Sequence, residues 1–373
     1  MLSTGFEQNT RRAAWQDEPS IAGLLVPLIT CLPALFPKTH HGAVLSVASA
    51  LPQQLSRFFG FECPLHDTSN GPDFLACISR AERTRLSSYH VPVSIAGSHA
   101  AERAWERLRQ FGLNWLSVHS PLHDLILNLW MEFDLGSVAT GILPNVFLGP
   151  RELVNTGNPH WMGILIAALQ DLSGEQIPTG TRACLSRCVG AMPSGAGVFQ
   201  AGVMTSRRPA YVRICVTGLQ PTGLLQFLAD VGWPGCRQRV EPFLDRPGAL
   251  VDRIDVDLDI GADVGSVLGL EFSFVPKRPP HREPRWLAVV NWLVREGLCL
   301  EPECEALLRF AGYSYTVIDS STAEETHEKE SQPSGSRVDV LVRGLNHLKL
   351  TFQADRITAK AYLSMRCCSW AVA

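Results

Sequence analysis

The feature that most constrains the fold is an alternation of polar and apolar side chains along paired short segments. In the last pair, residues 347–364, the polar face carries His347, Lys349, Lys360 and Tyr362. A period of two indicates a β-strand with one buried face and one polar face. Because a short polar turn joins the two segments, the sequence predicts an antiparallel hairpin here.

The same pattern occurs four more times upstream, at residues 59–80, 125–149, 198–216 and 251–275. Two helix-like segments precede each hairpin. We expect these helices at residues 20–35 and 43–58, 81–89 and 98–111, 160–172 and 181–191, 222–231 and 238–244, and 286–296 and 301–310. Strands with an apolar face need a cover, which the intervening helices can supply. The expected fold class is therefore α+β, built from five units of two helices and two strands.

Ten antiparallel strands of this kind predict a closed β-barrel. Closure removes the sheet edges and turns the polar faces inward. Side chains alone cannot fill a barrel of about ten strands, so we expect a chamber inside and the helices outside. We expect one domain over residues 19–366, between a flexible tail at residues 1–18 and a second tail at residues 367–373.

Residues 319–337 form an insert within this domain. The insert is acidic and rich in serine, with almost no apolar side chains to bury. Burial there cannot offset the entropy lost on ordering, so the sequence predicts a mobile segment. Shortening it should change the melting temperature little.

Composition excludes several classes of protein. The chain has 373 residues with 46% hydrophobic content, ample for a large core, and a net charge of −3. This charge, without a basic tract, argues against a nucleic-acid partner. Eleven cysteines without CxxC pairs and without a signal peptide favour reduced thiols and a cytoplasmic location. The apolar run at residues 21–36 is interrupted by Pro27 and Pro33 and is too short to span a bilayer.

Charged and aromatic side chains gather on the expected inward faces. They include Trp130, Glu132, Arg213, Asp255, Asp257, Glu271, His347, Lys349, Lys360 and Tyr362. An arginine at position 213, between β-branched neighbours, needs a cavity or a salt bridge to one of the aspartates. Carboxylates alternating along a strand are about 6.6 Å apart, which favours a solvated face over a metal site. We assign no metal-ligating residue.

This organisation, over residues 20–365, resembles the ABBA prenyltransferases, whose fold is a ten-stranded antiparallel barrel called the PT barrel. The resemblance implies an isoprenoid diphosphate inside the barrel, held by lysine, arginine and tyrosine, with aromatic rings shielding the allyl cation. It implies substrate-binding roles for Arg213, Lys349, Lys360, Tyr362, Trp130 and His347. It also implies that Glu132 acts as the base toward an aromatic acceptor. That family lacks aspartate-rich metal motifs, so no cofactor is required.

The charge balance departs from the family. Three inward cations, or four with His347, face a larger set of acids: Glu132, Asp134, Asp255, Asp257, Asp259 and Glu271. A trianionic diphosphate would meet mostly like charge, which is costly in a low-dielectric cavity. Three explanations stay open: Mg²⁺ bridges carboxylates to phosphates, several acids lie at the mouth, or the barrel binds something else.

Three functions follow from these alternatives. The first is a natural-product prenyltransferase that uses a prenyl diphosphate and an aromatic or peptide acceptor. The second is a cyclase or decarboxylase on the same scaffold, acting on an aromatic, indolic intermediate by acid–base chemistry, with Asp255, Asp257 and Glu271 as further acid–base groups. The third is a non-catalytic barrel that binds a small molecule. The sequence leaves the acceptor, the prenyl length and the oligomeric state open.

Overall fold

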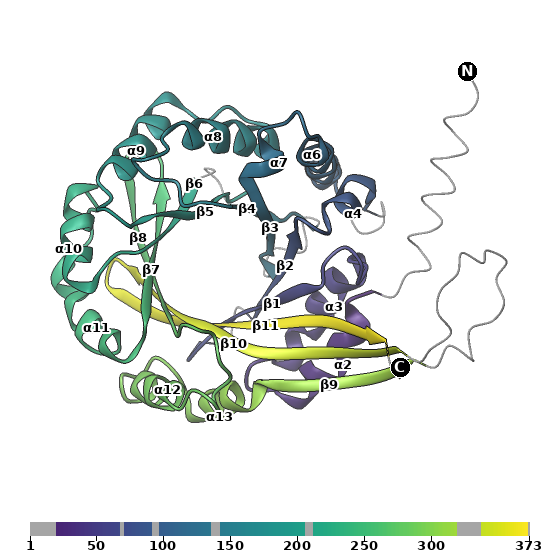
Figure 1. Ribbon diagram of the computed structural model, residues 1–373. Coiled ribbons are helices and arrows are strands. Elements are labelled where there is room, and N and C mark those ends of the chain that lie inside the picture. Colours follow the sequence, from purple (N-terminus) through teal and green to yellow (C-terminus); the bar gives the residue numbers. More distant parts are fainter. Residues whose placement is uncertain are drawn as a thin grey trace, which may run out of the picture.

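A closed antiparallel barrel forms the centre of the computed structural model, which describes residues 20–67, 71–91, 97–135, 142–205, 212–318 and 337–371. The described strands form one sheet in the order β11-β1-β2-β3-β4-β5-β6-β7-β8-β10-β9. Strand β11 also pairs with β10, which closes ten strands into a barrel with the helices around its outside (Figure 1). The predicted α+β barrel of five ααββ units is confirmed.

The ten barrel strands agree closely with the predicted hairpins. Their bounds are β1 Phe58–Pro64, β2 Asp73–Ser79, β3 Ile126–Phe133, β4 Asn145–Pro150, β5 Gly197–Val203, β6 Val212–Thr217, β7 Arg253–Ile260, β8 Val264–Ser273, β10 Arg337–Gln353 and β11 Arg356–Ala371. All described neighbours in this sheet pair antiparallel.

Two helices precede each hairpin, as expected, and the second unit has the short α7 in addition. Their bounds are α2 Ala22–Cys31, α3 His41–Ala50, α4 Arg83–Ser88, α6 His99–Leu116, α7 Leu122–Leu125, α8 His160–Ser173, α9 Thr179–Gly190, α10 Pro221–Asp230, α11 Glu241–Asp245, α12 Arg285–Arg295 and α13 Glu301–Phe310, with short 3₁₀ turns η1 Lys38–His40, η4 Arg237–Arg239 and η5 Gly248–Leu250. Within the described ranges, no helix combines the length and the apolar character needed to cross a membrane.

The hydrophobic core lies between the barrel wall and the helices. Phe59 and Phe61 alternate with Gly60 and Glu62 on β1, and both phenylalanines are completely buried. Phe61 packs edge-to-face against Phe36, with ring centroids 4.8 Å apart. The period of two thus sends apolar side chains outward to the helices and leaves the other face for the chamber.

The last two strands are longer than predicted and extend beyond the barrel. Strand β10 begins at Arg337, and β11 continues to Ala371, so the prediction of a tail at residues 367–373 is wrong for residues 367–371. Their outer halves pair with each other, and an eleventh strand, β9 Gly312–Ile318, pairs with β10 at the edge. We call this part, β9 with the outer halves of β10 and β11, the outer ribbon (Figure 1). The tail at residues 1–18 and all of the predicted insert except Arg337 lie outside the described residues.

Candidate active site

The chamber inside the barrel is a cavity of about 240 Å³ lined by side chains from every barrel strand. Eight of the predicted inward residues line it: Trp130, Glu132, Arg213, Asp257, Glu271, His347, Lys349 and Tyr362. Four predicted inward residues do not line it: Asp134, Asp255, Asp259 and Lys360. Of these, Asp255 contacts Arg253 and Lys360 contacts Glu62. Aromatic rings complete the lining, with Phe58 and Trp130 edge-to-face at 5.1 Å and with Phe147 on β4 and Phe199 on β5.

A buried ion pair lies at the centre of the chamber. The Lys349 ammonium contacts the Asp257 carboxylate and lies 3.5 Å from the Tyr362 hydroxyl. Burial lowers the pKa of Lys349, but the charges of Asp257, Glu271 and Glu62 together outweigh this and raise it above its ordinary value. In turn, Lys349 and Arg213 lower the pKa of Asp257 against the effect of burial. Both groups are therefore charged at neutral pH.

Arg213 forms a two-pronged salt bridge across the neighbouring strands β6 and β7. Its Nε lies 2.7 Å from Asp259 Oδ1 and its Nη2 lies 3.0 Å from Asp259 Oδ2. The two side chains are only 12% and 15% exposed. Of the two alternatives for this arginine, a cavity or a salt bridge to an aspartate, the structure has the salt bridge at the edge of the cavity.

Glu62 joins the first barrel strand to the last. Its carboxylate accepts hydrogen bonds from the Lys360 ammonium on one oxygen and the Tyr362 hydroxyl on the other. Burial would raise the pKa of Glu62, but the Lys360 and Lys349 charges lower it well below its ordinary value. Glu62 was not among the residues predicted to face the chamber, although it alternates with Phe61 in the same period of two.

Glu132 differs from the other carboxylates of the chamber. Its side chain is 7% exposed, and no hydrogen bond or ion pair joins it to another described residue. Burial, together with the charges of Glu62 and Asp134, raises the pKa of Glu132 to about 7. Asp73, on the neighbouring strand β2, has its pKa raised by burial and by Glu62 to about 8. Both carboxyl groups can therefore exchange a proton near neutral pH.

His347 is a neutral side chain in this setting. Its ring stacks on Tyr362 at 4.0 Å between centroids, and its Nε2 lies 3.5 Å from Glu271 Oε1. Burial and the nearby Lys277 charge lower the pKa of His347 well below its ordinary value, while burial raises the pKa of Glu271. His347 therefore adds no positive charge to the chamber.

Comparisons with known proteins bear on this architecture. No family profile and no curated protein matches the chain. Among solved structures, the chain is similar to the crystal structure of the prenyltransferase PriB in its apo form, with a TM-score of 0.50 and 14% identity over 94% of this chain and 96% of that one. A 6-dimethylallyl tryptophan synthase is similar over 93% of this chain and 96% of its own, with a TM-score of 0.49 and 14% identity. The chain has the PT-barrel fold.

The PT barrel brings together more charge than the sequence pattern indicated. Asp255 is buried, and its Oδ2 lies 2.9 Å from Arg253 Nε. Arg253 and Lys277 also line the chamber, and neither was predicted. Arg253 alternates with Asp255 on β7 and could have been found from the period of two. Lys277 follows the end of β8 in a proline-rich connection, where no period applies.

Three carboxylates of the PT barrel have the donor type that Mg²⁺ prefers. Oxygens of Glu62, Asp73 and Glu132 all lie within 4.8 Å of one another. Glu62 already accepts hydrogen bonds from Lys360 and Tyr362, so a cation bound by all three would compete with Lys360. The three carboxylates are of the ligand type that Mg²⁺ prefers, but one of them, Glu62, already has Lys360 as a cationic partner.

Proposed function

We propose that this protein is a prenyltransferase that moves an isoprenoid group from a diphosphate to an aromatic or peptide acceptor. The main support for this proposal is the environment of Glu132. This residue is a buried carboxyl group without a cationic partner among the described residues, in an aromatic-lined PT-barrel chamber, with a pKa near 7. A base of this pKa suits removal of a proton from an acceptor at neutral pH.

The reaction balances without a redox partner. The carbon–oxygen bond of the donor breaks, and the diphosphate leaves with the electron pair. The allylic carbon then bonds to the acceptor ring, and the ring proton passes to the Glu132 carboxylate. The faces of Trp130, Phe58 and Tyr362 can stabilise the allylic cation through cation–π attraction. We propose that no cofactor is required; Mg²⁺ bound at Glu62, Asp73 and Glu132 would add positive charge to the chamber.

A second candidate function rests on the pairing of the chamber cations. Lys349 contacts Asp257, Arg213 contacts Asp259, and Lys360 contacts Glu62. Each of the three cations expected to hold phosphates is thus already neutralised by a carboxylate. This pairing favours a cyclase or decarboxylase that exchanges protons with an aromatic substrate through Glu132 and Asp73.

Prenyl diphosphates with an indole acceptor distinguish the two candidates. We expect dimethylallyl or geranyl diphosphate to bind to the purified protein in a calorimeter and diphosphate to be released when the acceptor is added. Glu132→Gln should leave donor binding within about twofold and slow single turnover by about 10²–10⁴-fold, because a base acts in the transition state. Glu305→Gln, an exposed glutamate on α13, is the control and should match the wild type.

The transferase would be excluded if the folded wild type binds no prenyl diphosphate at about millimolar concentration. A Kd of that size corresponds to a standard binding free energy of about −4 kcal/mol. The cyclase or decarboxylase would then be tested with indolic carboxylates alone. Slower proton exchange in Glu132→Gln would support it.

A further inference from the structure

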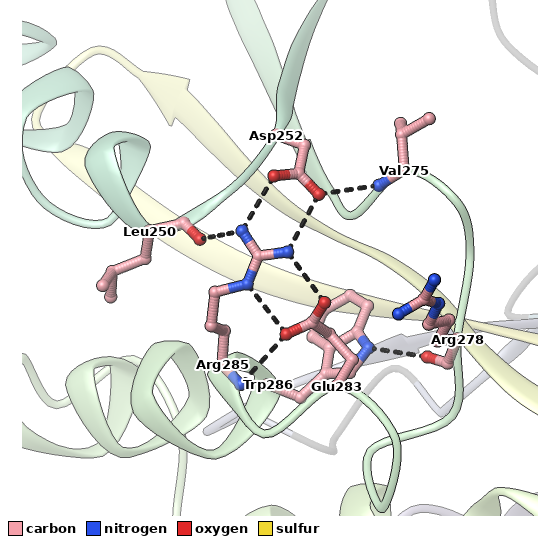
Figure 2. Close-up of polar contacts among 7 residues, drawn as sticks. All are labelled: Leu250, Asp252, Val275, Arg278, Glu283, Arg285 and Trp286. Carbon is pink, nitrogen blue, oxygen red and sulfur yellow. Dashed lines mark hydrogen bonds and ion pairs between the residues drawn. The ribbon is translucent and has the colours of Figure 1, made fainter.

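Arg285 joins three segments of chain just outside the barrel wall (Figure 2). Its Nη1 and Nη2 donate to Asp252 Oδ1 and Oδ2 at 2.8 and 3.0 Å, and its Nε and Nη2 donate to Glu283 at 2.8 and 2.7 Å. Asp252 Oδ2 also accepts the backbone N–H of Val275 at 3.0 Å. The start of β7, the end of β8 and the start of α12 therefore meet at one guanidinium.

Aromatic packing next to Arg285 also fixes the connection between the end of β8 at Ser273 and the start of α12. The Arg285 guanidinium carbon lies 4.5 Å from the centre of the Phe274 ring. That ring packs edge-to-face against Trp286, with centroids 4.6 Å apart. The Trp286 indole N–H donates to the backbone oxygen of Arg278 at 3.2 Å. Residues 275–278 are thus anchored at both ends.

These anchors place two cations on the chamber. Arg253 directly follows Asp252, and Lys277 comes two residues after Val275, and both line the cavity. The Arg253 side chain is 39% exposed and Lys277 is exposed, so they lie at the open end, whereas the Lys349 side chain is only 9% exposed.

The two cations differ in their partners: Arg253 Nε contacts the buried Asp255 carboxylate at 2.9 Å, whereas Lys277 has no such carboxylate among the described residues. The Lys277 ammonium contacts the amide oxygen of Asn346, and no carboxylate of a described residue lies within ion-pair distance of it. Two like charges held at one opening raise the local affinity for an anion, which would stabilise both.

We infer that Arg253 and Lys277 bind the diphosphate of the prenyl donor at the open end of the chamber, and that Arg285 is the positioning residue that holds them there. The inference rests on the proposed function for the identity of the anion. It assigns the phosphates to the more exposed cations Arg253 and Lys277 and leaves the less exposed Arg213, Lys349 and Lys360 to structural roles.

Calorimetry with inorganic pyrophosphate tests the site without the transfer reaction. We expect pyrophosphate to bind to the wild type, and Lys277→Met and Arg253→Gln each to raise its Kd by about tenfold or more, since each removes a charge-assisted contact. Arg278→Gln is the matched control. It removes the same charge one residue along the same connection, from a side chain that does not line the chamber, and should change Kd by less than about twofold.

Steady-state kinetics test the positioning role. In Arg285→Lys the charge stays, but a lysine cannot make the paired contacts to Asp252 and Glu283. We expect the KM for the donor to rise about fivefold or more with kcat within about twofold, because the deeper groups are unchanged. Asp252→Asn should raise the KM for the donor in the same way, because it removes a carboxylate partner of Arg285. A lower melting temperature with an unchanged KM would mean that Arg285 only stabilises the fold.

The outcomes separate this inference from the proposed function. The site is overturned if pyrophosphate does not bind to the wild type, or if Lys277→Met binds it as Arg278→Gln does. If the binding pattern is as expected and no prenyl diphosphate is consumed, the anion site stands and the transferase fails. If prenyl transfer occurs and is insensitive to Lys277→Met, the transferase stands and the site fails.

Discussion

Glu132 exchanges its proton near neutral pH because its surroundings favour the uncharged form. Burial contributes most, and the negative charges of Glu62 and Asp134 act in the same direction. Glu62 has the opposite balance, since Lys360 and Lys349 keep it ionised. Two carboxyl groups on nearby strands thus reach different charge states through their partners, and only one is available as a base.

The raised pKa of Glu132 predicts a pH-dependent stability. The pKa is about 7 in the folded protein against an ordinary value of 4.5, so the folded state binds this proton more tightly. The resulting stabilisation is full below about pH 4.5 and is lost as the pH rises through about 7. Between those limits, we expect the wild type to lose on the order of 3 kcal/mol more unfolding free energy than Glu132→Gln. Urea titrations at several pH values measure this difference, and parallel curves would contradict it.

Strand periodicity explains which side chains the sequence could place. A period of two fixes the face of each residue, so Glu132, Lys349 and Tyr362 were correctly expected on the chamber wall. The partners of those residues depend on the register between strands that are distant in sequence, which a single strand does not encode. The contact of Arg213 with Asp259 is of this kind. Lys277, outside any strand, gave no periodic signal.

The pairing of β1 with β11 depends on a residue without a side chain. Gly60 lies opposite Ser364, and a Cβ added at Gly60 would collide with the backbone carbonyl oxygen of Leu363. A backbone atom in a paired strand cannot move aside at low cost. The close approach of these two strands therefore requires glycine at this position.

Gly60→Ala is expected to destabilise the protein by about 1–3 kcal/mol, the usual range for overpacking. The control is Gly163→Ala in α8, where an added Cβ would meet no atom within 4 Å. That change should stabilise the helix by about 0.5–1 kcal/mol, because alanine loses less backbone entropy on folding. Denaturant unfolding of both variants measures the contrast. Equal effects of the two substitutions would contradict the close approach.

At the scale of the whole molecule, β11 closes the barrel. It pairs with β1 from Phe58↔Arg366 to Pro64↔Lys360, and with β10 along nearly its full length. Its last five described residues pair with β10 in the outer ribbon, and the first of them, Cys367, also donates its backbone N–H to the Arg57 carbonyl oxygen at 2.8 Å. The barrel part and the ribbon part of one strand can therefore be removed separately.

Two truncations should have different effects. A chain that ends at Gln353 lacks β11 and leaves both β1 and β10 with an open edge, so we expect no cooperative thermal transition and aggregation on size-exclusion chromatography. A chain that ends at Arg366 keeps every β1–β11 register pair and loses part of the outer ribbon together with the single Cys367–Arg57 backbone hydrogen bond. It should remain monodisperse with a cooperative transition. Loss of cooperativity in the second chain would show that the ribbon is needed for closure.

The contact of Glu62 with Lys360 spans 298 residues of chain, which has a consequence during synthesis. A ribosome needs roughly 15–60 s to add that many residues, at about 5–20 per second. Throughout that interval β1 has been made but its neighbour on the closing side has not. The nascent chain therefore holds an open sheet, and the chamber around Glu62 and Tyr362 forms only after the last strand emerges.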